Sequence, residues 1–381
     1  MISNVNPSKI TEARDSRAVS MEELATYVGV TRQSISKYER GIAKPSTEVL
    51  QSISYYLDFP VSFFHSTDSS VPANNITLFF RSNSNISKKV KSACKYQIEW
   101  IDEIKAKLET YVDFVDQNVP VVDKDYEDIS LEEIENLALS IRQQWGLGDA
   151  PINDLIGVLE NNGVIVSPLS INRLCEFKGI DAFSSWIIGT PYIAYNPAKK
   201  SAVRTRFSIL HELGHLVLHS SIPNEDAIKK DIIDKADMQA DRFAAAFLLP
   251  ATSFVKDVYG TSLSSLEVIK QKWGVSMSAI IKRYETLDLM TENQLNYLKR
   301  QMTAKKYWYK EPLDDQITLA PPEIIRDAIM MLVDNNIVSK ELFLHLVKLS
   351  ADDVINMCCL PSDYFDSCNR RKPMLRVISS H

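Results

Sequence analysis

The sequence lacks the features that mark membrane proteins and secreted proteins. No run of about 18 apolar residues occurs in its 381 residues, so no membrane-spanning helix is expected. The N-terminal stretch MISNVNPSKITEARD has neither the basic nor the apolar region of a signal peptide. The five cysteines form no C-x-x-C pair, which argues against a disulfide framework and a zinc ribbon. We therefore expect a cytoplasmic protein with reduced thiols and no membrane partner.

The chain also lacks an excess of positive charge. Its 43 Lys and Arg against 49 Asp and Glu give a net charge of −6, so it does not coat nucleic acid through bulk charge. A small local DNA-reading surface remains compatible with this balance, because only the docking face must be positive. The length predicts two or three domains, and a hydrophobic content of 45% is ample for their cores.

Helical and strand-like patterns predict a mainly α protein with a small β-sheet, of the α+β class. Three short segments rich in Val, Ile and Tyr, at 163–169, 181–189 and 192–196, have the pattern of strands. Helical patterns surround them and continue to about Cys359. We expect a domain of short helices at 1–65, a linker and long helix at 66–125, an α+β domain at 126–312 and a helical C-terminal region at 313–381.

The long helix is predicted from about Ile86 to Gln117, before Pro120. Its apolar positions recur every three or four residues, at Cys94, Ile98, Ile101, Leu108, Val112 and Val115. Such a stripe either packs on neighbouring parts of the same chain or forms a short coiled-coil seam between two chains. Both alternatives stay open at this point.

Residues 20–46 have the pattern of a helix-turn-helix. Ser20 followed by Glu23 is a capping box that starts one helix, and Gly29 permits a tight turn. Thr31 caps a second helix, whose buried face includes Ile35. The opposite face is polar and basic, as contacts to base edges and phosphates require. The candidate DNA-contacting residues are Arg32, Gln33, Ser36, Lys37, Arg40 and Lys44.

The segment VGVTRQSISKYERGIAKPS resembles the helix-turn-helix of XRE-type regulators. The resemblance covers roughly residues 8–60 and implies an operator in double-stranded DNA as a partner. XRE-type readers usually bind two half-sites as dimers, so it also implies a homodimer. A helix-turn-helix used only for protein interaction is the alternative.

The strongest chemical signal is the HELGH motif at 211–215. Two histidines four residues apart lie on one helix face, about 6 Å apart along the axis, so both imidazoles can bind one ion. Glu212 is placed to accept a proton from an attacking water. His219 lies about 12 Å from His211 along the axis and is too far to share the ion, so we interpret it as a core or supporting residue. Gly214, unfavourable inside a helix, indicates that another backbone passes close by.

A catalytic zinc ion usually has three protein ligands. The third is expected from the helix at 235–250, where Asp237 and Asp241 are the candidates. Two acids at that position are also explained by a favourable interaction with the dipole of the helix N-terminus.

The run from Tyr195 to Pro250 resembles the ImmA/IrrE-type metallopeptidases, through YNPAKKSAVRTRFSILHELGHLVLH and QADRFAAAFLLP. The resemblance implies a zincin-like fold with one Zn²⁺ per chain, other divalent metals being acceptable. It implies His211 and His215 as ligands and Glu212 as the catalytic base. The family's third ligand, commonly Glu, corresponds to Asp237, which suggests a gluzincin-like site with a shorter acid.

Together the two motifs suggest a DNA-binding transcriptional regulator with a zinc-dependent peptidase domain. It would cleave a partner repressor or itself in response to a signal such as stress, a mobile element or a phage. One alternative is a non-proteolytic transcription factor whose peptidase-like domain is a metal-stabilised sensor or docking module. Another is a component of a toxin–antitoxin or phage-defence pair.

Overall fold

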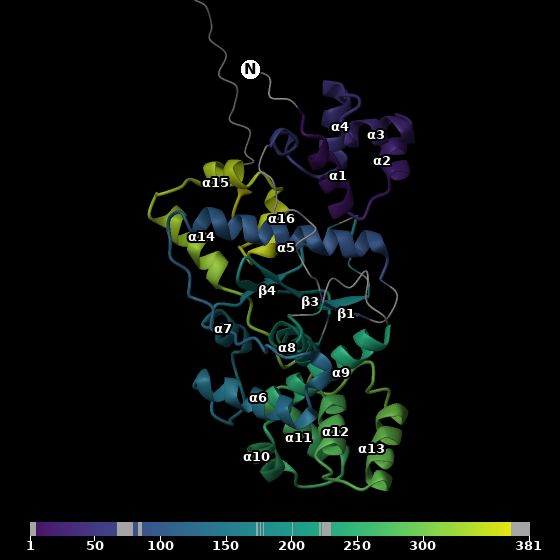
Figure 1. Cartoon of the computed structure of the whole chain (residues 1–381), viewed down its shortest axis with the longest axis vertical. Coiled ribbons are helices and arrows are strands. Elements are labelled where there is room, and N and C mark those ends of the chain that lie inside the picture. Colours follow the sequence, from purple (N-terminus) through teal and green to yellow (C-terminus); the bar gives the residue numbers. More distant parts are fainter. Residues whose placement is uncertain are drawn as a thin grey trace, which may run out of the picture.

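The computed structural model describes residues 5–66, 79–82, 86–172, 174, 175, 177, 179–199, 201–220, 222 and 230–366. The protein is mainly helical and has a four-stranded sheet, which confirms the expected α+β class. Helices lie on both faces of this sheet (Figure 1). Within the described residues, no helix combines the length and apolar character needed to span a bilayer.

Four short helices form the N-terminal part. They are α1 (Pro7–Ser16), α2 (Met21–Val28), α3 (Arg32–Glu39) and α4 (Thr47–Leu57). The predicted capping box of α2 is present, with Ser20 and Glu23 bonded reciprocally. Gly29 ends α2 with φ +77°, a conformation in which a side chain would be strained, and the Thr31 side chain caps α3. The local sequence therefore determines both helices of the turn.

The long helix α5 (Lys88–Leu108) is shorter than predicted. After Leu108 the chain runs beside another segment, where the Asn118 N–H donates to the Asn162 carbonyl. Gly163 makes room for it, since a Cβ there would lie 2.4 Å from the Gln117 Cα. After Leu108, contacts with another segment take the place of helical structure, so the predicted end of the long helix at Gln117 was wrong.

The apolar stripe of α5 is buried within the chain. Cys94, Ile98, Ile101 and Leu108 are each at most 2% exposed, and α5 packs against α1. This supports packing on the same chain and removes these residues as a coiled-coil seam. Most of the predicted linker at 66–85 lies outside the described residues.

The sheet has the strand order β1-β3-β4-β2. β3 (Ile180–Ile187) and β4 (Thr190–Tyr195) form a hairpin, joined by Ile188 and Gly189, which both have positive φ as a type I′ turn requires. β2 (Ile165–Pro168) pairs parallel to β4. β1 (Phe79–Ser82), which the sequence did not predict, pairs antiparallel to β3 at the edge.

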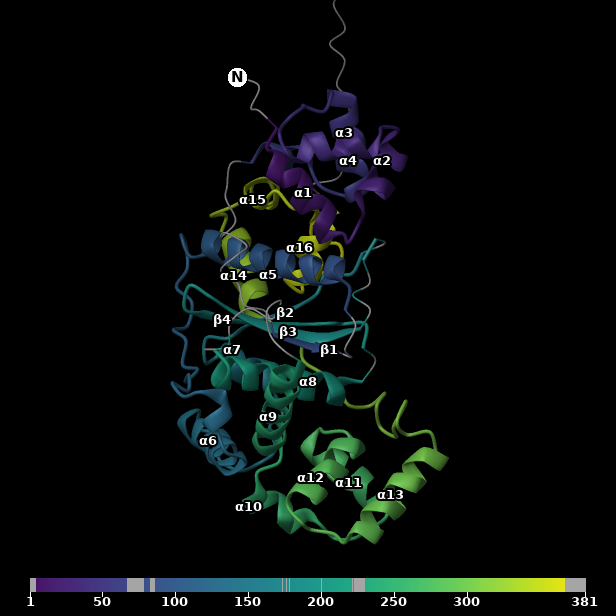
Figure 2. The ribbon, with the colours of Figure 1, turned by 45° about the vertical axis from the view of Figure 1, so that its right-hand side comes forward.

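Alternate residues of the sheet contribute to two cores. Phe183 and Ile187 belong to the core shared with α5 and the N-terminal helices, whereas Ala182 belongs to the core around α8 (Ala202–Leu218). Figure 2 shows α5 on one side of the sheet and α8 on the other. The remaining helices on the α8 side of the sheet are α6 (Leu131–Gln144), α7 (Leu155–Glu160), α9 (Lys230–Leu248), α10 (Ala251–Phe254), α11 (Leu263–Trp273), α12 (Met277–Thr286) and α13 (Glu292–Ala304).

The C-terminal helices return to the N-terminal part of the chain. α14 (Ile324–Asp334), α15 (Lys340–Val347) and α16 (Ala351–Met357) join the core that contains α5 and the N-terminal helices. Arg17, just after α1, forms a buried ion pair with Asp353 of α16, with side chains 1% and 2% exposed. This pair connects two segments that lie 336 positions apart in the sequence.

Candidate metal centre and nucleic-acid interface

Helices α8 and α9 cross closely enough to bring their side chains onto one site. At Gly214 the two backbones lie very close together, because a Cβ added there would lie 3.1 Å from the Ala240 Cα. The prediction that another backbone passes this glycine is therefore confirmed. The close crossing places acidic residues of α9 beside the two histidines of the HELGH motif.

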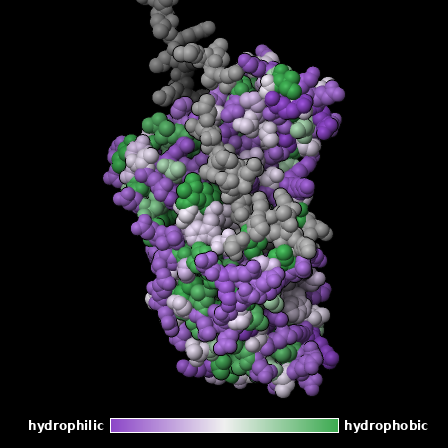
Figure 3. Space-filling view, viewed as in Figure 1, coloured by the Kyte–Doolittle hydropathy of each residue, from purple (hydrophilic) through white to green (hydrophobic). Residues whose placement is uncertain are grey.

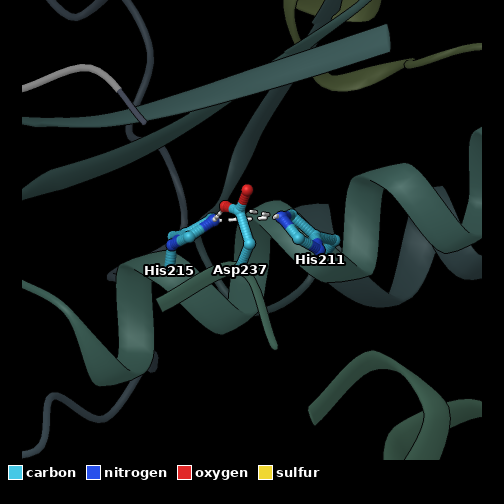
Figure 4. A group of neighbouring side chains, drawn as sticks. All are labelled: His211, His215 and Asp237. Atoms are coloured by element: carbon cyan, nitrogen blue, oxygen red, sulfur yellow. Dashed lines mark hydrogen bonds and ion pairs between the residues drawn. The ribbon is translucent and has the colours of Figure 1, made fainter. Parts of the chain in front are cut away.

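Three electron-pair donor atoms converge between these helices (Figure 4). The Nε2 atoms of His211 and His215 are 3.0 Å apart. Asp237 Oδ1 lies 3.7 Å from the first and 3.3 Å from the second. Both imidazoles are buried, whereas the Asp237 side chain is 36% exposed and forms the open side of the group.

These spacings fit a tetrahedral divalent ion. With metal–ligand bonds of about 2.0–2.1 Å, tetrahedral geometry requires ligand atoms roughly 3.3 Å apart. The three observed separations of 3.0, 3.3 and 3.7 Å bracket that value. Asp237 reaches the site from α9 although its side chain is one methylene shorter than the Glu that the resemblance implies. Two imidazoles and one carboxylate are also the ligand types that zinc prefers.

The alternative ligand, Asp241, contacts the other nitrogen of the same imidazole. Its Oδ1 lies 2.7 Å from His211 Nδ1, and a carboxylate can only accept at that distance, so Nδ1 carries the proton. The lone pair of His211 is then on Nε2, toward His215 and Asp237. Asp241 thus orients the His211 imidazole and fixes its tautomer, as carboxylates behind metal-bound histidines commonly do.

A second chain of hydrogen bonds fixes His215. Gln239 donates through Nε2 to the carbonyls of Tyr126 and Ile129, so its Oε1 accepts from His219 Nε2 at 3.0 Å. His219 Nδ1 is then the acceptor for the His215 Nδ1–H, 2.9 Å away. The lone pair of His215 is thereby left on Nε2. His219 is a supporting residue, in agreement with its interpretation from helix geometry.

Burial keeps these histidines neutral at pH 7. It lowers the pKa of His215 to about 4 and that of His219 to about 3. The lone pairs of both Nε2 atoms and the Asp237 carboxylate oxygen are turned toward one another, so the group attracts a cation.

Glu212 follows His211 on α8 and is turned toward the sheet. It is fully buried, and the Ser184 hydroxyl on β3 donates to its Oε2 at 2.9 Å. No sequence pattern points to Ser184, Gln239 or Asp353, because each acts through a contact between segments distant in the chain. Asp241 is predicted from the sequence, but as a rival ligand.

The predicted DNA-reading residues lie together on α3 and the turn after it. The exposed ones are Arg32, Gln33, Lys37, Arg40 and Lys44, and Ser36 is half-buried. Ile35 on the opposite face is fully buried. Hydrophilic residues predominate over the N-terminal helices on the face shown in Figure 3.

Two family models match the chain. A helix-turn-helix model matches residues 10–64, and a model of the IrrE N-terminal-like domain matches residues 176–285. A putative HTH-type transcriptional regulatory protein of Methanococcus vannielii is 30% identical over 105 residues, which cover 28% of this chain and 29% of that protein. An uncharacterized HTH-type transcriptional regulator of Sinorhizobium medicae is 42% identical over 57 residues, 15% of this chain and 41% of that protein. The chain thus spans less than half the length of either relative.

The chain is thus similar to two kinds of domain. Residues 10–64 match a helix-turn-helix, and residues 176–285, which contain the candidate metal ligands, match an IrrE-like domain.

Proposed function

We propose that this protein is a cytoplasmic DNA-binding transcriptional regulator with a zinc-dependent peptidase activity that cleaves a protein in response to a signal. The observation that carries the proposal is the convergence of His211, His215 and Asp237 next to Glu212. The same chain presents an exposed basic recognition helix. In this proposal residues 1–65 form the DNA-binding domain, and residues 66–125 form a linker and a long helix. Residues 126–312 form the peptidase domain, and residues 313–381 form the helical C-terminal region.

The residues of the site have separate roles in the proposed hydrolysis. A bound Zn²⁺ would polarise the substrate carbonyl and make water more acidic. Glu212 takes the proton of the attacking water and returns it to the leaving amine. The Ser184 hydroxyl holds one oxygen of this carboxylate and leaves the other to accept the proton. Asp241 and His219 keep the imidazoles in the tautomer that the ion needs.

The DNA-binding half follows from α3. Its N-terminal residues Arg32 and Gln33 have side chains suited to guanine and adenine edges, and Lys37, Arg40 and Lys44 to phosphates. We propose a homodimer on a two-half-site operator. Since the apolar stripe of α5 is buried within one chain, the dimer contact involves another surface.

Glu212→Gln tests the peptidase activity. The neutral amide keeps the size of the side chain and the hydrogen bond from Ser184, so the variant should bind zinc and DNA as the wild type does. It should lose at least two orders of magnitude in hydrolysis of an unstructured protein or a co-expressed partner. Equal hydrolysis by both proteins would remove Glu212 as the base. Ser184→Ala is the companion variant, with a smaller loss.

One observation favours the non-proteolytic alternative. Glu212 is 0% exposed, although a general base must meet water. If the domain is a metal-stabilised sensor or docking module, zinc raises the stability of the wild type and of Glu212→Gln equally. No hydrolysis is then detected with either protein, while DNA binding persists.

A further inference from the structure

The edge strand β1 comes from outside the IrrE-like domain. Phe79–Ser82 precede the matched residues 176–285 and follow the helix-turn-helix match, which ends at residue 64. They lie antiparallel to β3, which would otherwise be the edge of the sheet. Figures 1 and 2 both show β1 beside β3, above α8. The described part of this connection, Phe79–Ser82, therefore lies against α8.

The register brings this connection next to the catalytic base. Phe79 pairs with Ser184, the residue whose hydroxyl donates to Glu212 Oε2. Paired residues of neighbouring strands are about 5 Å apart at Cα. β1 also contacts α8 directly. The main chain at residue 79 is thus one strand spacing from the residue that holds the base.

A peptidase with this arrangement must bind an extended peptide beside its catalytic base. Peptides are commonly recognised by adding a strand to an exposed sheet edge, where main-chain hydrogen bonds align them. Here β1 occupies that edge of β3. The full burial of Glu212 agrees with an occupied edge.

We propose that Phe79–Ser82 is the tethered substrate of this site, so that the chain cleaves its own connection. This inference rests on the proposed peptidase function. The oxygen of water adds to one peptide carbonyl in or beside residues 79–82, and Glu212 takes the proton. The C–N bond then breaks, and the leaving nitrogen receives that proton, which yields one new carboxylate and one new amine. No reactant other than water is needed.

Cleavage in or beside residues 79–82 breaks the covalent connection between the DNA-reading helices and the domain with the metal ligands. The DNA-reading helix α3 lies before the cut, and the metal ligands lie after it. The two fragments then remain connected only through non-covalent contacts, among them the buried pair of Arg17 and Asp353. Cleavage would convert a fixed DNA reader into one that can dissociate.

The test uses the full chain prepared without metal. One variant carries Phe79→Gly, Phe80→Ser and Arg81→Gly, which removes the strand-forming residues of β1. A matched control carries Gln316→Gly, Ile317→Ser and Thr318→Gly in the connection between α13 and α14. Circular dichroism and zinc stoichiometry check that each variant folds. Before zinc is added, hydrogen exchange should show protected amides at 79–82 and 180–187, with protection of β3 reduced only in the β1 variant.

On addition of Zn²⁺, wild type and control should split into two fragments whose new termini, located by mass spectrometry, lie in or beside 79–82. Glu212→Gln and the β1 variant should not split there. The half-time should be unchanged on tenfold dilution, as an intramolecular reaction requires. A cleavage half-time that lengthens on dilution would contradict intramolecular cleavage and overturn the proposal. Fast hydrogen exchange of the amides at 79–82 would also overturn it.

A wild-type chain that stays intact while it or the β1 variant hydrolyses added casein would refute this inference and leave the peptidase function standing. If no preparation hydrolyses anything, the proposed function fails as well.

Discussion

Replacing Asp353 by Asn should destabilise the contact between the DNA-reading helices and the rest of the molecule. The Arg17 guanidinium donates through Nη1 to Asp353 Oδ1 at 2.9 Å and through Nη2 to Oδ2. The hydroxyls of Ser170 and Ser350 donate to the same carboxylate. The asparagine amide would set an N–H against a guanidinium N–H and leave a buried positive charge unpaired.

The size of the effect follows from the burial of both partners. Their side chains are 1% and 2% exposed, so water cannot replace the lost carboxylate. Removing one partner of such a pair costs about 3–5 kcal/mol. The Leu57 carbonyl still accepts from Arg17 Nε, which places the expected cost near the lower end of that range.

Native-state hydrogen exchange of amides in α1 and α16 measures this free energy locally, without assuming that a chain of this size unfolds in one step. Asp315→Asn is the matched control, because Asp315 pairs with Lys310 on the surface, with both side chains at least 70% exposed. It should leave these amides unchanged. A loss below about 1 kcal/mol for Asp353→Asn would refute the view that this pair connects the two ends of the chain.

Three further predictions concern the metal, pH and DNA. Asp241→Asn should weaken zinc binding about 10–100-fold in a chelator competition, since the carboxylate orients His211, and unchanged affinity would contradict that role. Burial raises the pKa of Glu99 from 4.5 to about 8. Between pH 4.5 and about 8 the folded state therefore binds one proton more than the unfolded state, so the free energy of unfolding falls as the pH rises through this range. The fall is on the order of 1.4 kcal/mol per pH unit, and Glu99→Gln should flatten it in denaturant titrations at several pH values. In fluorescence anisotropy measurements of DNA binding, Arg32→Ala should reduce the preference between bases at the position that this side chain contacts. Lys44→Ala should weaken binding to all DNA sequences alike and reduce the salt dependence of binding by about one counterion.

The sequence was most informative where structure is local. The Ser20 capping box, the turn at Gly29 and the spacing of His211 and His215 depend on residues a few positions apart. Even the close passage of another backbone, which the structure shows to be α9, could be inferred, because Gly214 weakens its own helix and is favoured where a larger side chain would collide with a neighbour.

The parts that sequence reasoning missed depend on contacts between distant segments. The sequence pattern predicts helix up to Gln117 because nothing local ends it at Leu108, and it places β1 in a linker because Phe79–Ser82 form a strand only beside β3. The choice between Asp237 and Asp241 needed the orientation of one imidazole, whose two nitrogens contact the two acids separately.

The central claim is that one ion is shared by three side chains from α8 and α9. Crystals of the zinc-loaded protein, with diffraction recorded on both sides of the zinc absorption edge, test it directly. We expect one strong anomalous peak within about 2.0–2.2 Å of His211 Nε2, His215 Nε2 and a carboxylate oxygen of Asp237. The absence of a peak there, or a peak bonded to Asp241 in place of Asp237, would contradict it.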